Sequence, residues 1–425
     1  MKEKQSEIDR RNFLKTIGAA GLGSVFAGCK GKAENDQTPS NPEAPAAAEQ
    51  EKIPQVPRRK LGKTGVEVSC LGLGTMFNLV DAQIVLRSTL KWGVKYWDTA
   101  SSYAGGNSEL GIGKFLSGNP QVRKELFIVS KASGARTVAD VEKRLQTSLE
   151  RMNTDYIDMY YAPHGASDPA QFTDELKKWV EGAKKRKLIR FFGFSTHSNM
   201  AACLAAAAKL GWIDAVMPMY NFRHMQDDEL QKAIDACHKA GIAIVAMKTT
   251  GKTTIERFRL SIETEADKKL VQHFLERGFT AEQAAIKLVL QDKRISAAPV
   301  QMETVAVLTQ NVAAVLDKTE LTRKDEEVFR EYAKATCCGY CSGCARICDS
   351  ALPDVLRPGW ISDIMRYLMY YNSYGDQARA RELFAEIPGQ VRAKLLSTDY
   401  NVVEARCPQH LPITELVAEA VSKLA

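Results

Sequence analysis

This chain of 425 residues lacks a large excess of charge of either sign, and its N-terminal apolar stretch is short. The 58 lysines and arginines are nearly matched by 51 aspartates and glutamates, so the net charge is only +7. The basic cluster Lys184 to Lys187 has no aromatic side chains between its charges, which is typical of a solvated helix end and argues against nucleic-acid binding. The uncharged stretch Thr16 to Gly28 is too short for an ordinary transmembrane helix.

The N-terminal residues have the pattern of an export signal. Arg10 and Arg11 precede the short apolar stretch, and this order predicts a twin-arginine signal peptide over residues 1–29. The stretch Phe26 to Cys29 is similar to a lipoprotein cleavage box, so a lipid anchor on Cys29 is expected, with simple cleavage or retention as alternatives. Residues 30–57 contain few large apolar side chains and are predicted to be a flexible linker. The expected location is the periplasm, either free or as a membrane-anchored lipoprotein.

Strand-like runs then alternate with helical stretches eight times. The segment Thr137 to Met152 shows the helical pattern, because its apolar residues recur every three or four positions and Thr137 fits an N-cap. This alternation predicts parallel strands closed into an α/β fold, a (β/α)8 barrel. The predicted strands are Val66–Leu73, Val94–Trp97, Leu126–Lys131, Tyr156–Tyr161, Leu188–Ser195, Ala215–Met219, Ile242–Met247 and Ile295–Pro299.

Four polar residues lie at or just after the ends of these strands. They are Asp98, Tyr103, Lys131 and His164. In such a barrel the carboxyl ends of the strands meet at one mouth, where catalysis takes place. Each residue alone has an ordinary structural explanation, but an acid, a phenol, an amine and an imidazole gathered together indicate a proton-delivery site.

The order of these residues resembles the catalytic tetrad of the aldo/keto reductases, and the resemblance covers roughly Arg58 to Thr322. It implies hydride transfer between a nicotinamide nucleotide, NADP or NAD, and a small carbonyl or alcohol substrate. Tyr103 would be the general acid, with a pKa lowered by Lys131, while Asp98 would orient Lys131 and His164 would align the carbonyl. The resemblance also implies cofactor contacts from Ser195, Thr196, Tyr220 (by ring stacking), Lys248 and Asn311.

Three features depart from the family pattern. Pro163 is inserted before His164 and suggests a bulge or an early strand end. Met217 stands where the family often has a glutamine, and the stretch from Ala297 replaces the usual Ile-Pro-Gly. These changes leave open a second hypothesis, a non-catalytic binding or electron-transfer protein on a reductase scaffold.

The C-terminal residues 323–425 are predicted to form a mostly helical, cysteine-rich module, following a barrel over residues 58–322. Cys338, Cys341, Cys344 and Cys348 have the C-x2-C-x2-C-x3-C spacing of a ferredoxin run, which favours a [4Fe–4S] cluster over zinc or disulfides. Cys407 precedes a proline and competes with Cys348 as the fourth ligand. A structural role and exchange of electrons with an external partner both stay open for the cluster.

Between the two cysteine sites, Ile361 to Tyr371 and Ala378 to Leu396 are helix-like. Met365, Leu368 and Met369 recur at helical spacing and are expected to pack on the barrel.

Overall fold

The computed structural model describes residues 53–251, 264–357 and 359–425. The predicted signal peptide, Cys29 and most of the predicted linker lie outside this part. No helix within the described ranges is both long and apolar enough to cross a membrane.

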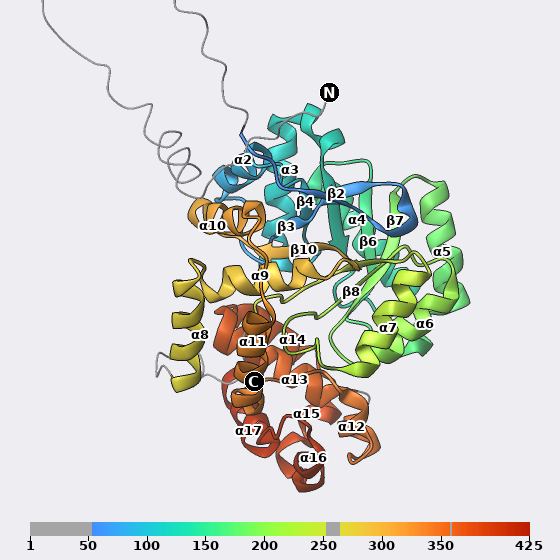
Figure 1. The fold of residues 1–425 in the computed structure, drawn as a ribbon. Coiled ribbons are helices and arrows are strands. Elements are labelled where there is room, and N and C mark those ends of the chain that lie inside the picture. The colour runs from blue at the N-terminus through green and yellow to red at the C-terminus, as the bar shows by residue number, and fades with distance from the viewer. Residues whose placement is uncertain (1–52, 252–263, 358) are drawn as a thin grey trace, which may run out of the picture. The chain divides into compact units, whose positions relative to one another are not determined.

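Eight parallel strands close into a barrel in the order β10-β3-β4-β5-β6-β7-β8-β9, as the sequence predicted (Figure 1). The strands are β3 (Leu71–Gly74), β4 (Tyr96–Asp98), β5 (Phe127–Lys131), β6 (Ile157–His164), β7 (Ile189–Thr196), β8 (Ala215–Pro218), β9 (Ala243–Val245) and β10 (Ile295–Gln301). Tyr96, Phe127, Met159 and Met217 belong to a cluster of buried side chains from successive strands. The fold is therefore a (β/α)8 barrel with a packed interior.

The first predicted strand, Val66 to Leu73, is in fact two strands. Its beginning forms β2 (Glu67–Ser69), which pairs antiparallel with β1 (Arg58–Lys60), and its end forms β3. Leu61 and Val68 of this hairpin pack in the same cluster as the barrel strands. A break at Cys70 separates two pairings that the apolar pattern alone cannot distinguish.

Helices surround the barrel, and their ends follow ordinary capping chemistry. In α4 (Val138–Met152) Thr137 and Asp140 form a reciprocal capping box, and Val141, Leu145 and Met152 are buried. The other helices are α2 (Gln83–Lys91), α3 (Asn107–Gly118), α5 (Asp174–Lys185), α6 (Met200–Leu210), α7 (Asp228–Lys239), α8 (Glu265–Glu276), α9 (Ala281–Gln291), α10 (Val305–Leu316) and α11 (Arg323–Ala335). Phe329 of α11 packs with Phe274 of α8, so this helix extends the barrel's outer layer.

Residues 337–425, called the C-terminal module below, form a helical unit with a core of its own (Figure 1). Its helices are α12 (Ala345–Asp349), α13 (Trp360–Met369), α14 (Gln377–Ala385), α15 (Gly389–Arg392), α16 (Asn401–Arg406) and α17 (Ile413–Leu424). Met365, Leu368 and Met369 lie in this core, so the expectation that they pack on the barrel is wrong. Helical spacing marks a buried face but does not say which neighbour covers it.

The cysteine-containing loop of the module lies directly against the loop that follows β7. The backbone N–H of Asn199 donates to the Gly343 carbonyl (2.9 Å), and the Arg346 N–H donates to Asn199 Oδ1 (2.9 Å). A Cβ atom on Gly343 would lie 1.9 Å from the His197 carbonyl oxygen, and Gly343 has a φ of 78°. Only glycine fits this contact without displacing backbone.

Replacing Gly343 with alanine is therefore expected to detach this part of the module from the barrel. We expect the free energy of unfolding to fall by about 2 kcal/mol or more, because the change adds both a steric clash and backbone strain. Thermal unfolding and limited proteolysis measure the effect. Gly182→Ala in α5 is the matched control, since nothing lies within 4 Å of its Cβ position; helix propensity predicts a stabilisation of about 0.5–1 kcal/mol. Equal behaviour of the two variants would contradict this docking.

Candidate active site at the barrel mouth

The four predicted catalytic residues lie together at the carboxyl ends of three neighbouring strands. Asp98 ends β4, Lys131 ends β5 and His164 ends β6, while Tyr103 begins a short 3-10 turn after β4 (η2, Tyr103–Gly106). Lys131 Nζ lies 4.8 Å from the centre of the Tyr103 ring, and the Tyr103 and His164 ring centres are 6.1 Å apart. The strand order thus brings one acid, one phenol, one amine and one imidazole into a single cluster.

Asp98 and Lys131 form a buried ion pair beneath Tyr103. Lys131 Nζ donates to Asp98 Oδ1 at 2.6 Å and to the Thr99 carbonyl at 2.7 Å, and the Lys131 side chain is only 1% exposed. Burial raises the pKa of Asp98 and lowers the pKa of Lys131, and their mutual attraction opposes both shifts. An ion pair that costs this much desolvation is weak evidence for stability and fits a functional role better.

Burial raises the pKa of Tyr103 well above its ordinary value of 10, and the nearby carboxylate of Asp98 raises it further. The expectation that Lys131 lowers the pKa of this phenol is therefore wrong for the structure as it stands. The physical reason is that Asp98 lies 2.6 Å from the Lys131 ammonium and offsets its charge at the phenol.

His164 is oriented by a neighbouring hydroxyl. Its Nδ1 lies 2.8 Å from Ser133 Oγ, and the Ser133 backbone N–H donates to Ser101 Oγ (3.1 Å). Burial, reinforced by the charge of Lys131, lowers the pKa of His164 well below 6.5, so the ring is neutral near pH 7. When Ser133 donates to Nδ1, the single ring proton lies on Nε2 and can be donated to a substrate oxygen.

The bulge suggested by Pro163 is confirmed. The pairing of β6 with β7 shifts register between Tyr161 and His164, and the Ala162–Pro163 peptide is cis. Strand β6 nevertheless continues to His164, and the imidazole lines the same cleft as Tyr103.

The reduction of a carbonyl at this site should be nearly independent of pH. Because the Tyr103 pKa is raised, the proton-donating form persists at all pH values below about 10, and because the His164 pKa is lowered, that ring stays neutral above about pH 6.5. We expect kcat/KM for reduction to change less than about twofold between about pH 6.5 and 9 at saturating nucleotide. A one-proton fall in that range would instead indicate a phenol acidified by Lys131.

The expected cofactor residues are only partly brought together. The Ser195 hydroxyl accepts from the Gly165 N–H (3.1 Å), and Thr196 Oγ1 donates to the carbonyls of Ala166 and Ser198. Both side chains thus hold the loop that follows β6. Lys248, just after β9, places Nζ 4.5 Å from the centre of the Tyr370 ring. Asn311 is buried in α10 with 6% of its surface exposed.

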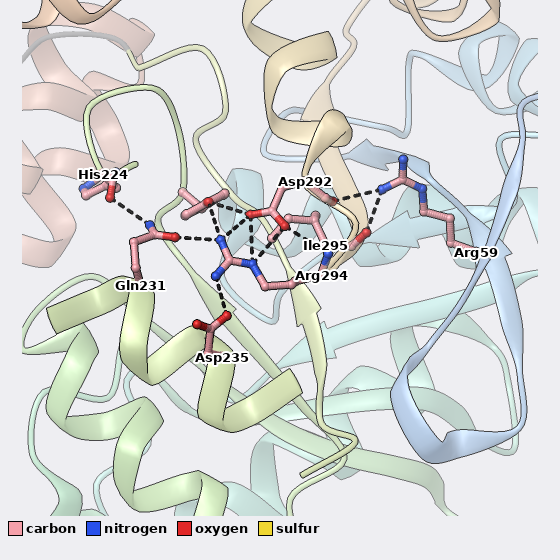
Figure 2. Close-up of polar contacts among 8 residues, drawn as sticks. Arg59, His224, Gln231, Asp235, Asp292, Arg294 and Ile295 are labelled. Atoms are coloured by element: carbon pink, nitrogen blue, oxygen red, sulfur yellow. Dashed lines mark hydrogen bonds and ion pairs between the residues drawn. The ribbon is translucent and has the colours of Figure 1, made fainter. Parts of the chain in front are cut away.

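Tyr220 lies away from the cleft that holds Tyr103. Its hydroxyl donates to Asp292 Oδ2 (2.7 Å) and accepts from Arg294 (3.3 Å), and its ring lines a separate pocket between α7, α9 and α11. Figure 2 shows the polar cluster around Arg294, which also contacts Gln231 and Asp235. These contacts hold the Tyr220 hydroxyl in place, and the expected stacking of its ring on a nicotinamide stays a prediction. The carboxylate partner, Asp292, lies 72 residues away in the chain and gave no local signal.

The cleft at the barrel mouth has one wall that sequence reasoning missed. It has a volume of about 160 Å³, and Tyr103 and His164 face it from the barrel side. The C-terminal module supplies most of the opposite wall, with Trp360, Asp363, Arg366, Tyr367, Tyr370, Arg379, Leu383 and Glu386. The sequence feature that could have indicated this wall is the run of arginine and tyrosine between Met365 and Tyr374. Helical periodicity alone predicts only that this run lies in a packed helix.

Four cysteines of the C-terminal module line a second, small cavity of about 10 Å³, which has room for about one water molecule. They are Cys341, Cys344, Cys348 and Cys407, and the remaining wall includes Ile361, Met365, Leu411 and Ile413. Cys338 is not among the residues that line it. The four cysteines that line the cavity are free thiols. Burial and the neighbouring sulfurs raise the pKa of Cys341, and the pKa of Cys344 is raised to about 11, so these thiols would ionise only if a metal balanced their charge.

The described structure does not arrange these thiols as a metal site. Within the described residues, no three histidine, cysteine or acidic side chains are placed to hold one metal ion. A single zinc ion requires its sulfurs about 2.3 Å from one point, whereas a cubane binds four thiolates at its corners.

Comparison with known proteins agrees with this geometry. Residues 70–330 match the model of the aldo/keto reductase family. The chain belongs to this family. It is 26% identical over 297 residues to L-galactose dehydrogenase of Arabidopsis thaliana, a match that covers 64% of this chain and 92% of that protein.

Two solved aldo-keto reductases share the barrel. The holo form of AKR11C1 from Bacillus halodurans superposes with a TM-score of 0.53 at 23% identity, covering 66% of this chain and 97% of that one. The thermostable enzyme Tm1743 in complex with the inhibitor epalrestat gives a TM-score of 0.52 at 25% identity, covering 65% and 99%. Both similarities cover about two thirds of this chain.

Proposed function

We propose that this protein is a nicotinamide-nucleotide-dependent oxidoreductase that acts on a small carbonyl or alcohol substrate. The observation that carries the proposal is the shared cleft, in which Tyr103 and His164 face the same space above the buried Lys131–Asp98 pair. Membership of a family that generally binds NADP(H), and the similarity to a dehydrogenase, support the same chemistry.

The nucleotide would supply the hydride when it is bound. Tyr103 would donate its phenolic proton to the oxygen of the carbonyl as negative charge develops there. His164, held by Ser133, would donate a hydrogen bond from Nε2 to the same oxygen and so orient it. The Lys131 ammonium beneath the ring would stabilise the phenolate that remains after the proton has left.

Titration of the purified protein with NADPH and NADH, followed by quenching of tryptophan fluorescence and by calorimetry, tests whether a nucleotide binds. We expect saturable binding of at least one nucleotide. If neither NADPH nor NADH binds, the enzymatic proposal is wrong, because no hydride donor would be available.

We further propose that Cys341, Cys344, Cys348 and Cys407 hold a [4Fe–4S] cluster. The support is the closed cavity that these four thiols line, together with the ferredoxin-like spacing of the first three. Cys407, brought from α16 to this cavity, would take the place predicted for Cys338. Iron and sulfide analysis of anaerobically purified protein tests the assignment, and protein that contains neither would contradict it.

Export by the twin-arginine route, with or without a lipid anchor on Cys29, stays part of this proposal and rests on the N-terminal sequence. Cell fractionation of the full chain and of an Arg10→Lys, Arg11→Lys variant tests it. Retention of both proteins in the cytoplasm would contradict export.

A further inference from the structure

The wall of the mouth cleft that comes from the C-terminal module carries two nearly buried arginines. Arg366 lies on α13 with 14% of its side chain exposed, and Arg379 lies on α14 with 8% exposed. Both line the same cleft as Tyr103 and His164. The proposed transfer of a hydride and a proton at Tyr103 and His164 does not require two guanidinium groups on the opposite wall.

Each arginine has one carboxylate partner and unused donor capacity. Arg366 Nη2 donates to Asp363 Oδ1 (2.8 Å), and Arg366 Nε is buried without a hydrogen-bond acceptor. Arg379 Nη1 lies 2.7 Å from Glu382 Oε2, but it does so in a geometry that forms no hydrogen bond. Glu382 is 52% exposed, so the partner of Arg379 lies toward solvent while the guanidinium lies toward the cleft.

A phenol of the module lies among these cations. Tyr370 begins the π-helical turn Tyr370–Tyr374 after α13, and π-helical turns are frequent at functional sites. The charges of Lys248, Arg366 and Arg379 lower the pKa of Tyr370 although the phenol is buried. Burial is the main cause of the lowered pKa of His164 across the cleft, and the charges of Lys131 and of the same three cations lower that pKa further. Groups on both walls therefore sense a positive potential inside the cleft.

The carboxylates on the cleft wall do not cancel this potential. Asp363 is already paired with Arg366. Glu386 lies at the exposed rim, where its carboxylate is 3.6 Å from the Cβ position of Gly134. Among the described residues that line the cleft, no further carboxylate is present to match the buried guanidinium groups.

We propose that Arg366 and Arg379 form a carboxylate-binding subsite, and that the substrate is an anionic carbonyl compound whose carboxylate the C-terminal module holds while its carbonyl faces Tyr103 and His164. Planar guanidinium groups recognise carboxylates by paired N–H···O bonds, which a lysine cannot reproduce. The inference deepens the proposed function and rests on it. It also gives the C-terminal module a direct part in selecting the substrate.

The test compares two aldehydes that differ in the charge of one group and by one methyl group, 4-carboxybenzaldehyde and its methyl ester. With saturating NADPH, the wild-type protein is expected to favour the carboxylate in kcat/KM by about 10- to 100-fold, the value of charge-assisted hydrogen bonds converted to a ratio. In Arg379→Gln this preference should fall to near one. Arg379→Lys should keep only part of the preference, because lysine keeps the positive charge but cannot donate two parallel N–H bonds to one carboxylate.

Arg381→Gln is the matched control on the same helix. Arg381 Nε donates to the Lys423 carbonyl and lies at the exposed side of α14, so its replacement should leave the preference unchanged. Equal kcat/KM for both aldehydes in the wild-type protein would overturn the subsite.

A binding measurement separates this inference from the proposed activity. Calorimetry with 4-carboxybenzyl alcohol, without nucleotide, should show binding that Arg379→Gln weakens and Tyr103→Phe does not. If neither aldehyde is reduced but this pattern holds, the activity fails and the subsite stands. If both aldehydes are reduced equally and 4-carboxybenzyl alcohol does not bind, the activity stands and the carboxylate subsite is wrong. A loss of NADPH affinity in Arg379→Gln equal to the loss of preference would also overturn it, since the anion held would then belong to the nucleotide.

Discussion

Replacing Tyr103 with phenylalanine is expected to lower kcat/KM for carbonyl reduction by about 10³-fold, with little change in nucleotide affinity. The change removes one oxygen atom, and with it the proton donor that faces the cleft, while the ring that packs against His164 stays in place. Loss of a general acid typically costs 10²- to 10⁴-fold. Steady-state kinetics with saturating NADPH, and nucleotide titration of the same preparation, measure the two effects separately.

Tyr220→Phe is the matched control for this prediction. It also removes a phenolic oxygen, but one that is bonded to Asp292 outside the mouth cleft. We expect kcat/KM close to the wild-type value. If Tyr220→Phe loses as much activity as Tyr103→Phe, the position that the structure gives to Tyr220 is not that of the working enzyme.

Replacing Cys341 with serine is expected to remove the cluster and loosen the C-terminal module. The iron content should fall from about four atoms per chain to well below that, and the absorption near 400 nm should disappear with it. Because a metal centre contributes its binding free energy to folding, the module should then become sensitive to proteases. The effect should reach the mouth cleft, since the module supplies Arg366 and Arg379 to its wall.

Cys338→Ser distinguishes this ligand set from the one favoured by spacing. Cys338 belongs to the ferredoxin-like run but does not line the cavity, whereas Cys407 does. We therefore expect Cys338→Ser to retain its iron and Cys407→Ser to lose it. The reverse result would restore the ligand set that the sequence predicted.

The barrel and its catalytic cluster could be predicted because their signals are local. A strand end followed by a polar side chain indicates the barrel mouth wherever it occurs, so the sequence alone is enough to place Asp98, Lys131 and His164 there. The register shift at Pro163 could be expected for the same reason, since proline cannot donate to the strand ladder.

The errors concern partners that are distant in the chain. The sequence does not indicate that the Tyr220 hydroxyl is bonded to a carboxylate 72 residues away. It predicts that the charge on Lys131 acidifies Tyr103, but that effect depends on how closely Asp98 approaches Lys131. The packing of the Met365 stripe, and the arginines at the cleft, depend on how the C-terminal module folds over itself and meets the barrel. Periodicity and spacing carry no information about such contacts.

The transfer of deuterium from C4-deuterated NADPH to 4-carboxybenzaldehyde tests the central claim most directly. We predict that the purified protein places one deuterium on the carbinol carbon of the product, that the rate is nearly constant between about pH 6.5 and 9, and that Tyr103→Phe lowers it by about 10³-fold. A protein that binds the nucleotide but transfers no deuterium to this or any other carbonyl compound, or a Tyr103→Phe variant that transfers it at the wild-type rate, would contradict the account.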